Sequence, residues 1–144
     1  MNELLQAIAD HLTFYGYRIV TNEGGVPPEV FSATHATRPL FWVLPIGSGA
    51  LLRALFSLGA ESVRDTNALN SFVNDANGIA LTGRYFVSEG SLVVAAWYVG
   101  THERERFDAF FQQYLADISF PATIWTDRVA ELFGTTVAPT DTNV

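Results

Sequence analysis

Two residue types are missing from this sequence: it contains no cysteine and no lysine. Without cysteine, the chain forms no disulfide, no zinc–thiolate site and no cysteine nucleophile. Its eight basic residues are therefore all arginines, and with 15 acidic residues the formal net charge is −7. Nucleic-acid binding depends on clustered cations that neutralise phosphates, so this charge balance argues against DNA or RNA as a partner.

Long hydrophobic runs are missing as well. No apolar stretch approaches the roughly 18 residues that span a membrane. The N-terminal stretch carries Glu3 and Asp10 but no base before Arg18, unlike the basic start of a signal peptide. We therefore expect a soluble, cytoplasmic protein that makes no contact with a membrane. With 49% hydrophobic and 16% charged residues in 144 positions, the composition is that of one folded domain rather than of a disordered chain.

Apolar residues at helical spacing predict four helices. They span residues 2–15, 65–78, 102–120 and 123–133. Asn2, Asp65 and Thr101 are residue types that cap helix starts. Asn77-Gly78 is expected to end the second helix, and Pro121 the third.

Strand-length segments lie between these helices. Residues 29–36 and 40–46 favour strands, and two further strands at 79–88 and 91–100 flank the hairpin signal Glu89-Gly90. The run ALLRALFSLG at 50–59 fits a strand or a helix equally well, because a short apolar run satisfies both periodicities.

The segment 91–100 has no polar face. One side carries Leu92, Val94, Ala96 and Tyr98, and the other carries Val93, Ala95, Trp97 and Val99. A strand that is apolar on both sides must be covered on both sides, by more of its own chain or by a partner.

The order of these elements resembles a known family. The segments LNSFVNDANGIALTGRYFVSEGSLVVAAWYVG and RFDAFFQQYLADI are similar to the YbjN-like proteins and to the type III secretion chaperones that share their fold. Leu69-Asn70 and Asn74 resemble the leucine–asparagine pattern of that family's middle helix, and Arg84-Tyr85-Phe86 resembles its first hairpin strand. The resemblance covers roughly residues 2–118, carries no catalytic signature and implies a strand at 50–59.

Two features depart from that family: the long loop at 22–28 and the helix at 123–133, which can cover a surface that a partner subunit would otherwise cover. The sequence predicts a single α+β domain over residues 1–134 and a loose polar tail at 135–144. The expected fold is an antiparallel sheet of about five strands with helices packed on it. Its order is α-βββ-α-ββ-α plus an extra C-terminal helix.

Glycines and acids provide no catalytic signature. Gly47-Ser48-Gly49 follows a strand, but Leu52 stands where a dinucleotide fingerprint needs its third glycine. A nucleophile elbow needs glycine two places before and two places after its serine, where Ile46 and Ala50 stand here. We interpret this segment as a hairpin turn. Asp108 and Asp117 fit outward positions of an amphipathic helix, which leaves neither in the apolar site that acid–base catalysis needs.

Histidines offer two weaker possibilities. His102 and Glu105 are three residues apart at a helix start and can share a face, so they could hold a metal ion if His11 or His35 supplied a third ligand. Asp10-His11 with Ser48 or Ser57 could form a hydrolase triad, although nothing in the spacing demands one. The simpler interpretation is a solvated helix start, and we expect no catalytic residue, no metal and no cofactor.

The functional hypothesis is a non-enzymatic protein-binding module. The resemblance implies a role in regulation or in holding a client, and the residues show surplus apolar surface that a partner segment or a second copy in a homodimer can cover. The candidate partner-binding residues are Trp42, Arg84, Trp97 and Trp125. The alternative is a small-ligand binder with a pocket between the sheet and the aromatic helix at 107–118, anchored by Arg84.

Overall fold

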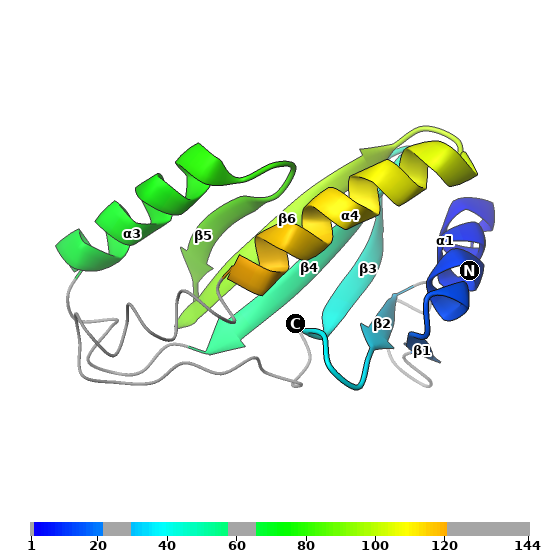
Figure 1. The fold of residues 1–144 in the computed structure, drawn as a ribbon, viewed down its shortest axis with the longest axis horizontal. Coiled ribbons are helices and arrows are strands. Elements are labelled where there is room, and N and C mark those ends of the chain that lie inside the picture. Colours follow the sequence, from blue (N-terminus) through cyan, green and yellow to red (C-terminus); the bar gives the residue numbers. More distant parts are fainter. Residues whose placement is uncertain (1, 22–29, 58–65, 121–144) are drawn as a thin grey trace.

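The computed structural model describes residues 2–21, 30–57 and 66–120. They form one antiparallel six-stranded sheet and three helices, which confirms the α+β class (Figure 1). In chain order the elements are α1 Glu3–Phe14, β1 Arg18–Thr21, β2 Phe31–Thr34, β3 Phe41–Ile46, β4 Gly49–Ser57, α3 Thr66–Ile79, β5 Arg84–Ser88, β6 Ser91–Val99 and α4 Arg104–Phe120. The strands lie in the order β1-β2-β3-β4-β6-β5.

One strand and one helix end differ from the sequence-based expectation, and the ambiguous run is the strand that the resemblance implied. The four-residue strand β1 was not predicted, because it begins only four residues after the end of α1 and is too short to show a periodicity. The ambiguous run at 50–59 is strand as far as Ser57, where its described part ends, since β4 pairs with β6 over nine residues. Helix α3 continues through Asn77-Gly78 to Ile79, with Ala80 N–H still bonded to the Ala76 carbonyl.

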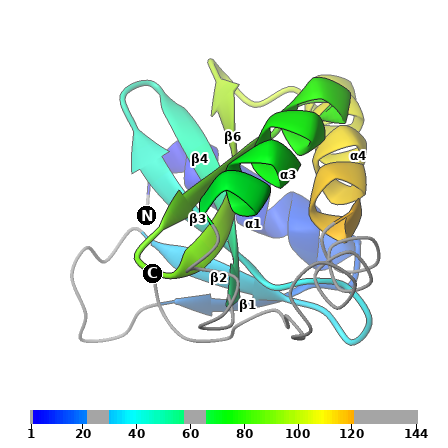
Figure 2. The ribbon, with the colours of Figure 1, turned by 90° about the vertical axis from the view of Figure 1, so that its left-hand side faces the viewer.

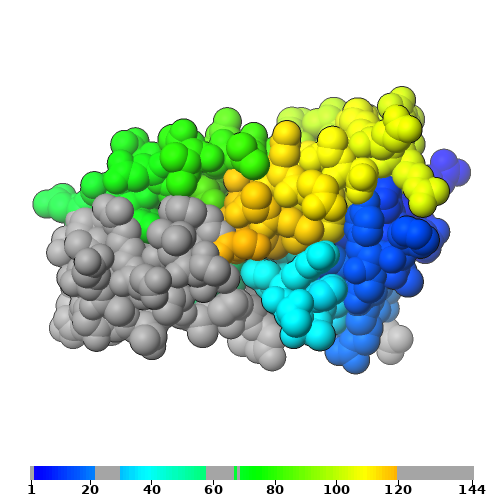
Figure 3. All heavy atoms as spheres, in the orientation of Figure 1, coloured from blue at the N-terminus to red at the C-terminus, as the bar shows by residue number. Residues whose placement is uncertain are grey.

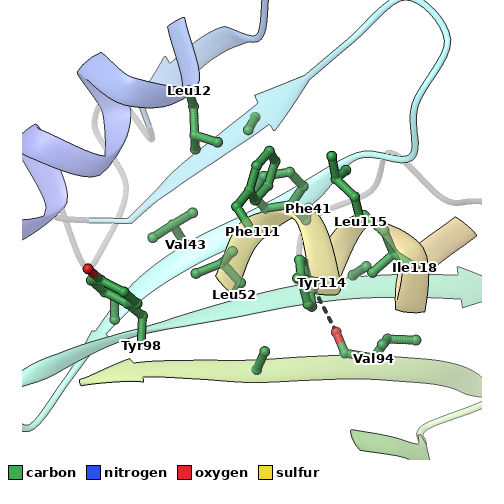
Figure 4. Packing of buried hydrophobic residues seen from close by; sticks show 14 of the residues in the cluster. Leu12, Phe41, Val43, Leu52, Val94, Tyr98, Phe111, Tyr114, Leu115 and Ile118 are labelled. Atoms are coloured by element: carbon green, nitrogen blue, oxygen red, sulfur yellow. Dashed lines mark hydrogen bonds between the residues drawn. The ribbon is translucent and has the colours of Figure 1, made fainter. Parts of the chain in front are cut away.

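All three described helices pack on one side of the sheet, which we call the inner face (Figure 2). In the space-filling view α4 lies between α3 and α1 across this face (Figure 3). Phe111, Tyr114 and Ile118 of α4 point onto β3, β4 and β6, and the Tyr114 hydroxyl donates a hydrogen bond of 2.9 Å to the Val94 carbonyl (Figure 4). Packing the helices on this face removes the core side chains of the sheet from water, which is favourable.

Asp117 of α4 ties the chain before β5 to this core. Its carboxylate accepts hydrogen bonds from the backbone N–H groups of Leu81 (2.9 Å), Thr82 (2.8 Å) and Gly83 (2.6 Å). Asp117 is only 3% exposed, so the expected outward position was wrong. The inward position is tolerable because three donors compensate the carboxylate for the water that it loses.

The free edge of strand β5 is covered by a side chain rather than by another strand. Asn77 of α3 donates through Nδ2 to the Tyr85 carbonyl (3.0 Å) and accepts through Oδ1 from the Tyr85 N–H (2.8 Å). This amide pairs with the backbone as a neighbouring strand would, and it blunts an edge that could otherwise pair with another chain.

Several predicted features lie outside the described residues. These are the loop at 22–28, the helix cap Asp65, the helix at 123–133 with Trp125, and the tail at 135–144. Within the described ranges, no helix has the length and apolar character needed to cross a membrane.

Candidate protein-binding face

The side of the sheet opposite the helices, the outer face, collects residues from distant parts of the chain. Trp42 on β3 lies opposite Arg53 on β4, which lies opposite Ala95 on β6, and Ala95 lies opposite Arg84 on β5. Because alternate strand residues share a face, Trp42, Arg53 and Arg84 stand in one row across four strands. Two of the predicted partner-binding residues are thus brought together, with an arginine between them that the sequence did not single out.

Trp97 stands in the next row of the outer face, beside Leu51 of β4. It is 53% exposed. Trp97 lies two residues beyond Ala95, and Ala95 is opposite Arg84. Trp97 is therefore a diagonal neighbour of Arg84, within reach of the long arginine side chain. Gly49 makes room for the indole, since a Cβ there would approach the Trp97 Nε1 to 2.6 Å. The third predicted residue therefore belongs to the same surface.

Exposure across the outer face is uneven. Val93, in the row next to Arg53 and Arg84, is fully buried. Four large apolar side chains of β3, β5 and β6 on this face are 42–53% exposed: Ile46, Phe86, Trp97 and Val99. We call these four residues the outer-face patch. An exposed apolar patch of this kind, with polar residues beside it, is typical of interaction sites.

The charge on this face has one sign. The six described strands contain no aspartate and no glutamate, although the chain as a whole has 15 acidic residues. Arg18, Arg53 and Arg84 all point outward, because Ile19, Leu52 and Tyr85 beside them point to the core. The outer face is therefore apolar and cationic on a molecule that carries an excess of negative charge.

Two donors in the central row have no acceptor. The Nε1 of Trp42 and the Nε of Arg53 are both buried and make no hydrogen bond within the described residues. They belong to directly opposed residues. Buried N–H groups without a partner are unfavourable by about 1–3 kcal/mol each.

Arg84 cannot anchor a ligand between the sheet and α4. Its side chain is exposed on the outer face and donates to the Gly83 carbonyl (2.9 Å), whereas α4 covers the inner face. The aromatic side chains of α4 fill the space expected to be a pocket: Phe41 lies 5.7 Å from Phe111 and 5.8 Å from Tyr114 between ring centres. The ligand-pocket alternative therefore loses both its cavity and its anchor.

Open cavities of the described part lie elsewhere, and two of them lie between α1 and the start of α4. One of about 440 Å³ is lined by His11, Phe14, Tyr15, Arg104, Glu105 and Asp108. Another of about 380 Å³ is lined by Ala7, Asp10, His11, Phe14, His102 and Arg104. At its rim the Arg104 guanidinium stands 5.4 Å above the Phe14 ring.

Two histidines meet beside these cavities. His11 Nδ1 is 3.4 Å from His102 Nε2, and His11 Nε2 is 2.9 Å from the Tyr15 hydroxyl. Burial lowers the pKa of His11, and so do His102 and Arg104, while Asp108 opposes the shift. Burial and Arg106 lower the pKa of His102. Both imidazoles are therefore neutral at pH 7.

The triad that the sequence allowed is not assembled. Both ring nitrogens of His11 face Tyr15 and His102, and the Asp10 carboxylate accepts from Gln6 Nε2 (2.9 Å). Gly47-Ser48 forms the expected turn between β3 and β4, with Gly47 in the left-handed region (φ 56°).

The predicted metal-binding set is only partly brought together. His11 reaches His102 from 91 residues away, but His35 lies beside Tyr17, with 5.0 Å between ring centres. Glu105 lines the cavity next to the pair without joining it. Among the described residues, no group of three or more histidine, aspartate or glutamate side chains is placed to hold a metal ion.

Comparison with known proteins identifies the fold. No family model matches the chain, and no curated protein matches it. Among solved structures it is similar to the crystal structure of YbjN from E. coli, a proposed transcription regulator, with a TM-score of 0.70 and 16% sequence identity. The match covers 94% of this chain and 96% of that chain. The likeness shows a YbjN-like fold, as the sequence resemblance predicted.

Proposed function

We propose that this protein is a non-enzymatic binding module whose outer sheet face holds a segment of a partner protein. The observation that carries the proposal is the outer-face patch, which leaves Trp97 and three other large apolar side chains partly in water beside Arg53 and Arg84. Covering them is favourable by roughly 25 cal/mol for each Å² of apolar surface removed from water. Aromatic residues and arginine are also the types that dominate binding energy at interfaces.

The chemistry of the face favours an apolar segment that carries carboxylates. The outward arginines meet no acidic residue on any described strand. A carboxylate placed beside Arg84, which is exposed, would accept from its guanidinium and neutralise its charge. Regulation through such a protein contact agrees with the description of YbjN as a proposed transcription regulator, without requiring the chain itself to bind DNA.

A second copy of the chain is the other candidate occupant, as a homodimer. Two copies joined through this face about a twofold axis would bring Arg53 and Arg84 of both into one interface, where like charges repel. Salt screening distinguishes the two occupants. A complex with an acidic segment weakens as salt is added, whereas a dimer through this face strengthens.

The test begins with photo-crosslinking in cells. A photoreactive amino acid at position 97 is expected to capture the partner, and the same group at Gln112, exposed on α4, is the control for the opposite side. The affinity of the purified partner is then measured by calorimetry for the wild type, Trp97→Ser and Phe14→Ser. Phe14 is 74% exposed but lies on α1.

We expect Trp97→Ser to weaken binding at least about tenfold, as hot-spot residues do, while Phe14→Ser leaves it unchanged. Circular dichroism checks that both variants keep the fold. Capture from position 112 alone, or equal affinity for the wild type and Trp97→Ser, would contradict the proposed face.

A further inference from the structure

The two histidines between α1 and α4 face each other at a distance that is long for a direct hydrogen bond. They come from separate elements, one in α1 and the other just before α4, which lie side by side in Figure 1. The facing nitrogens, His11 Nδ1 and His102 Nε2, are 3.4 Å apart. That is longer than the usual 2.7–3.2 Å of a nitrogen-donor hydrogen bond.

The same geometry fits two ligands of one metal ion. Imidazole nitrogens about 2.0–2.1 Å from a tetrahedral ion lie roughly 3.3–3.4 Å from each other, and their ring centres lie roughly 5.2 Å apart. The corresponding distances here are 3.4 Å between the nitrogens and 5.3 Å between the ring centres. We propose that His11 and His102 form a bidentate site for a divalent transition-metal ion.

The surroundings of His11 suit a metal ligand. Its other nitrogen, Nε2, is 2.9 Å from the Tyr15 hydroxyl, and a proton held there leaves the Nδ1 lone pair facing His102. Metal-binding histidines commonly donate their second N–H in this way, which fixes the tautomer and the ring orientation. His102 makes no second hydrogen bond through Nδ1 in the described part of the chain, so its only polar ring contact is the one to His11.

Access and charge also suit a cation. Both imidazoles line a cavity of about 380 Å³ with Asp10 and Arg104. The adjoining cavity adds Glu105 and Asp108. The walls of the two cavities thus carry three carboxylates and one arginine. Arg106 also lies close enough to His102 to lower its pKa.

The donor set selects the class of ion. The described residues provide no third protein ligand, so water completes the coordination. Imidazole nitrogen suits Zn²⁺, Ni²⁺ and Cu²⁺, whereas Mg²⁺ and Ca²⁺ prefer oxygen. An ion bound here would link α1 to the start of α4 and stabilise the folded chain, because the unfolded chain does not hold the two histidines together.

The test is calorimetric titration of the full-length, chelator-treated protein with Zn²⁺ and, separately, Ni²⁺. We expect one ion per chain, and at least about tenfold weaker binding in His11→Gln and in His102→Gln. His35→Gln is the matched control, because it removes the third histidine at a different place, and its binding should equal that of the wild type. Mg²⁺ should give no heat of binding.

Thermal unfolding provides a second readout that needs no comparison of affinities. Zn²⁺ should raise the melting temperature of the wild type, of His35→Gln and of Trp97→Ser, but not of the two pair variants. Equal Zn²⁺ binding in the wild type and His102→Gln would overturn the site, and so would an absence of Zn²⁺ binding to the wild type at millimolar concentration. His102 lies outside the regular elements, so His102→Gln keeps the test valid if His11→Gln fails to fold.

Discussion

Trp97 and Tyr98 are neighbours in strand β6, yet they belong to opposite regions of the molecule. Tyr98 is 1% exposed and packs on the inner face against Phe107 and Phe110, with 5.1 Å between ring centres in each case. Trp97 is 53% exposed on the outer face. Both are large aromatic residues on one apolar strand. The helices that pack on the inner face, rather than residue type, therefore decide which of them is buried in the core and which stays half-exposed.

The largest effect should come from substituting these two neighbours separately. Tyr98→Ala is expected to lower the free energy of unfolding by about 3–5 kcal/mol, since it leaves a cavity in the aromatic core. Trp97→Ala should lower it by less, roughly 2 kcal/mol at 25 cal/mol per Å² of buried apolar surface, because about half of the residue is already in water. Urea denaturation of both variants measures the difference, and similar losses would mean that the outer face is as much part of the core as the inner face.

The buried carboxylate of the inner face should rank next. Asp117→Ala removes the acceptor of three backbone N–H groups and should destabilise the protein by about 3 kcal/mol, because buried donors are left unpaired. Asp108→Ala is the matched control on the same helix, where the side chain is exposed. We expect less than about 0.5 kcal/mol for it by urea denaturation. A similar change in both variants would refute the anchoring role of Asp117.

Gly49 tests how closely the outer face is packed. Its substitution by alanine places a Cβ against the Tyr98 carbonyl and the Trp97 indole, and overpacking of this kind typically destabilises by about 1–3 kcal/mol. Because the backbone carbonyl remains in the way, Trp97→Ala should not restore stability to Gly49→Ala. Thermal unfolding of the double variant checks this, and full recovery would show that the indole alone causes the conflict.

The smallest effect expected is the response of the histidine pair to pH. The pKa values of His11 and His102 are lowered from the ordinary 6.5, so below about pH 6.5 the unfolded chain takes up protons more readily than the folded one. The free energy of unfolding should therefore be highest above pH 6.5 and decrease as the pH falls below it. This decrease should be smaller in His102→Gln and unchanged in His35→Gln, in metal-free buffer at pH 7.5 and 5.5. Equal decreases in all three proteins would contradict it.

Much of the fold could be predicted because its signals are local. The helical spacing of Leu5, Ile8 and Leu12, and of Phe107, Phe111 and Tyr114, marks faces that are indeed buried. The alternation of β6 predicted a strand with two apolar sides, and the Glu89-Gly90 turn predicted its hairpin. Trp42, Arg84 and Trp97 were selected by residue type, and the strand register then places all three on one face.

What could not be predicted depends on partners that are distant in sequence. Asp117 looked like a surface residue because its three donors are more than thirty residues away. Asn77 has the sequence signature of a helix end, because the sequence does not show that its amide pairs with the backbone of Tyr85 in β5. Arg53 gave no signal, since a single arginine in an apolar run does not show which face of a sheet it will occupy.

The sequence by itself determined the class of fold, the surplus of apolar strand surface and the acidic, cysteine-free chemistry, because periodicity and composition are properties of neighbouring residues. Only the tertiary structure decided which side of the sheet the helices would cover, that the charged residues of the described strands would all point to the outer face, and that His11 would meet His102. These outcomes depend on strand order and register, which bring residues together across long stretches of chain. The physical reason is that burial and charge act through space, while the sequence displays only order along the chain.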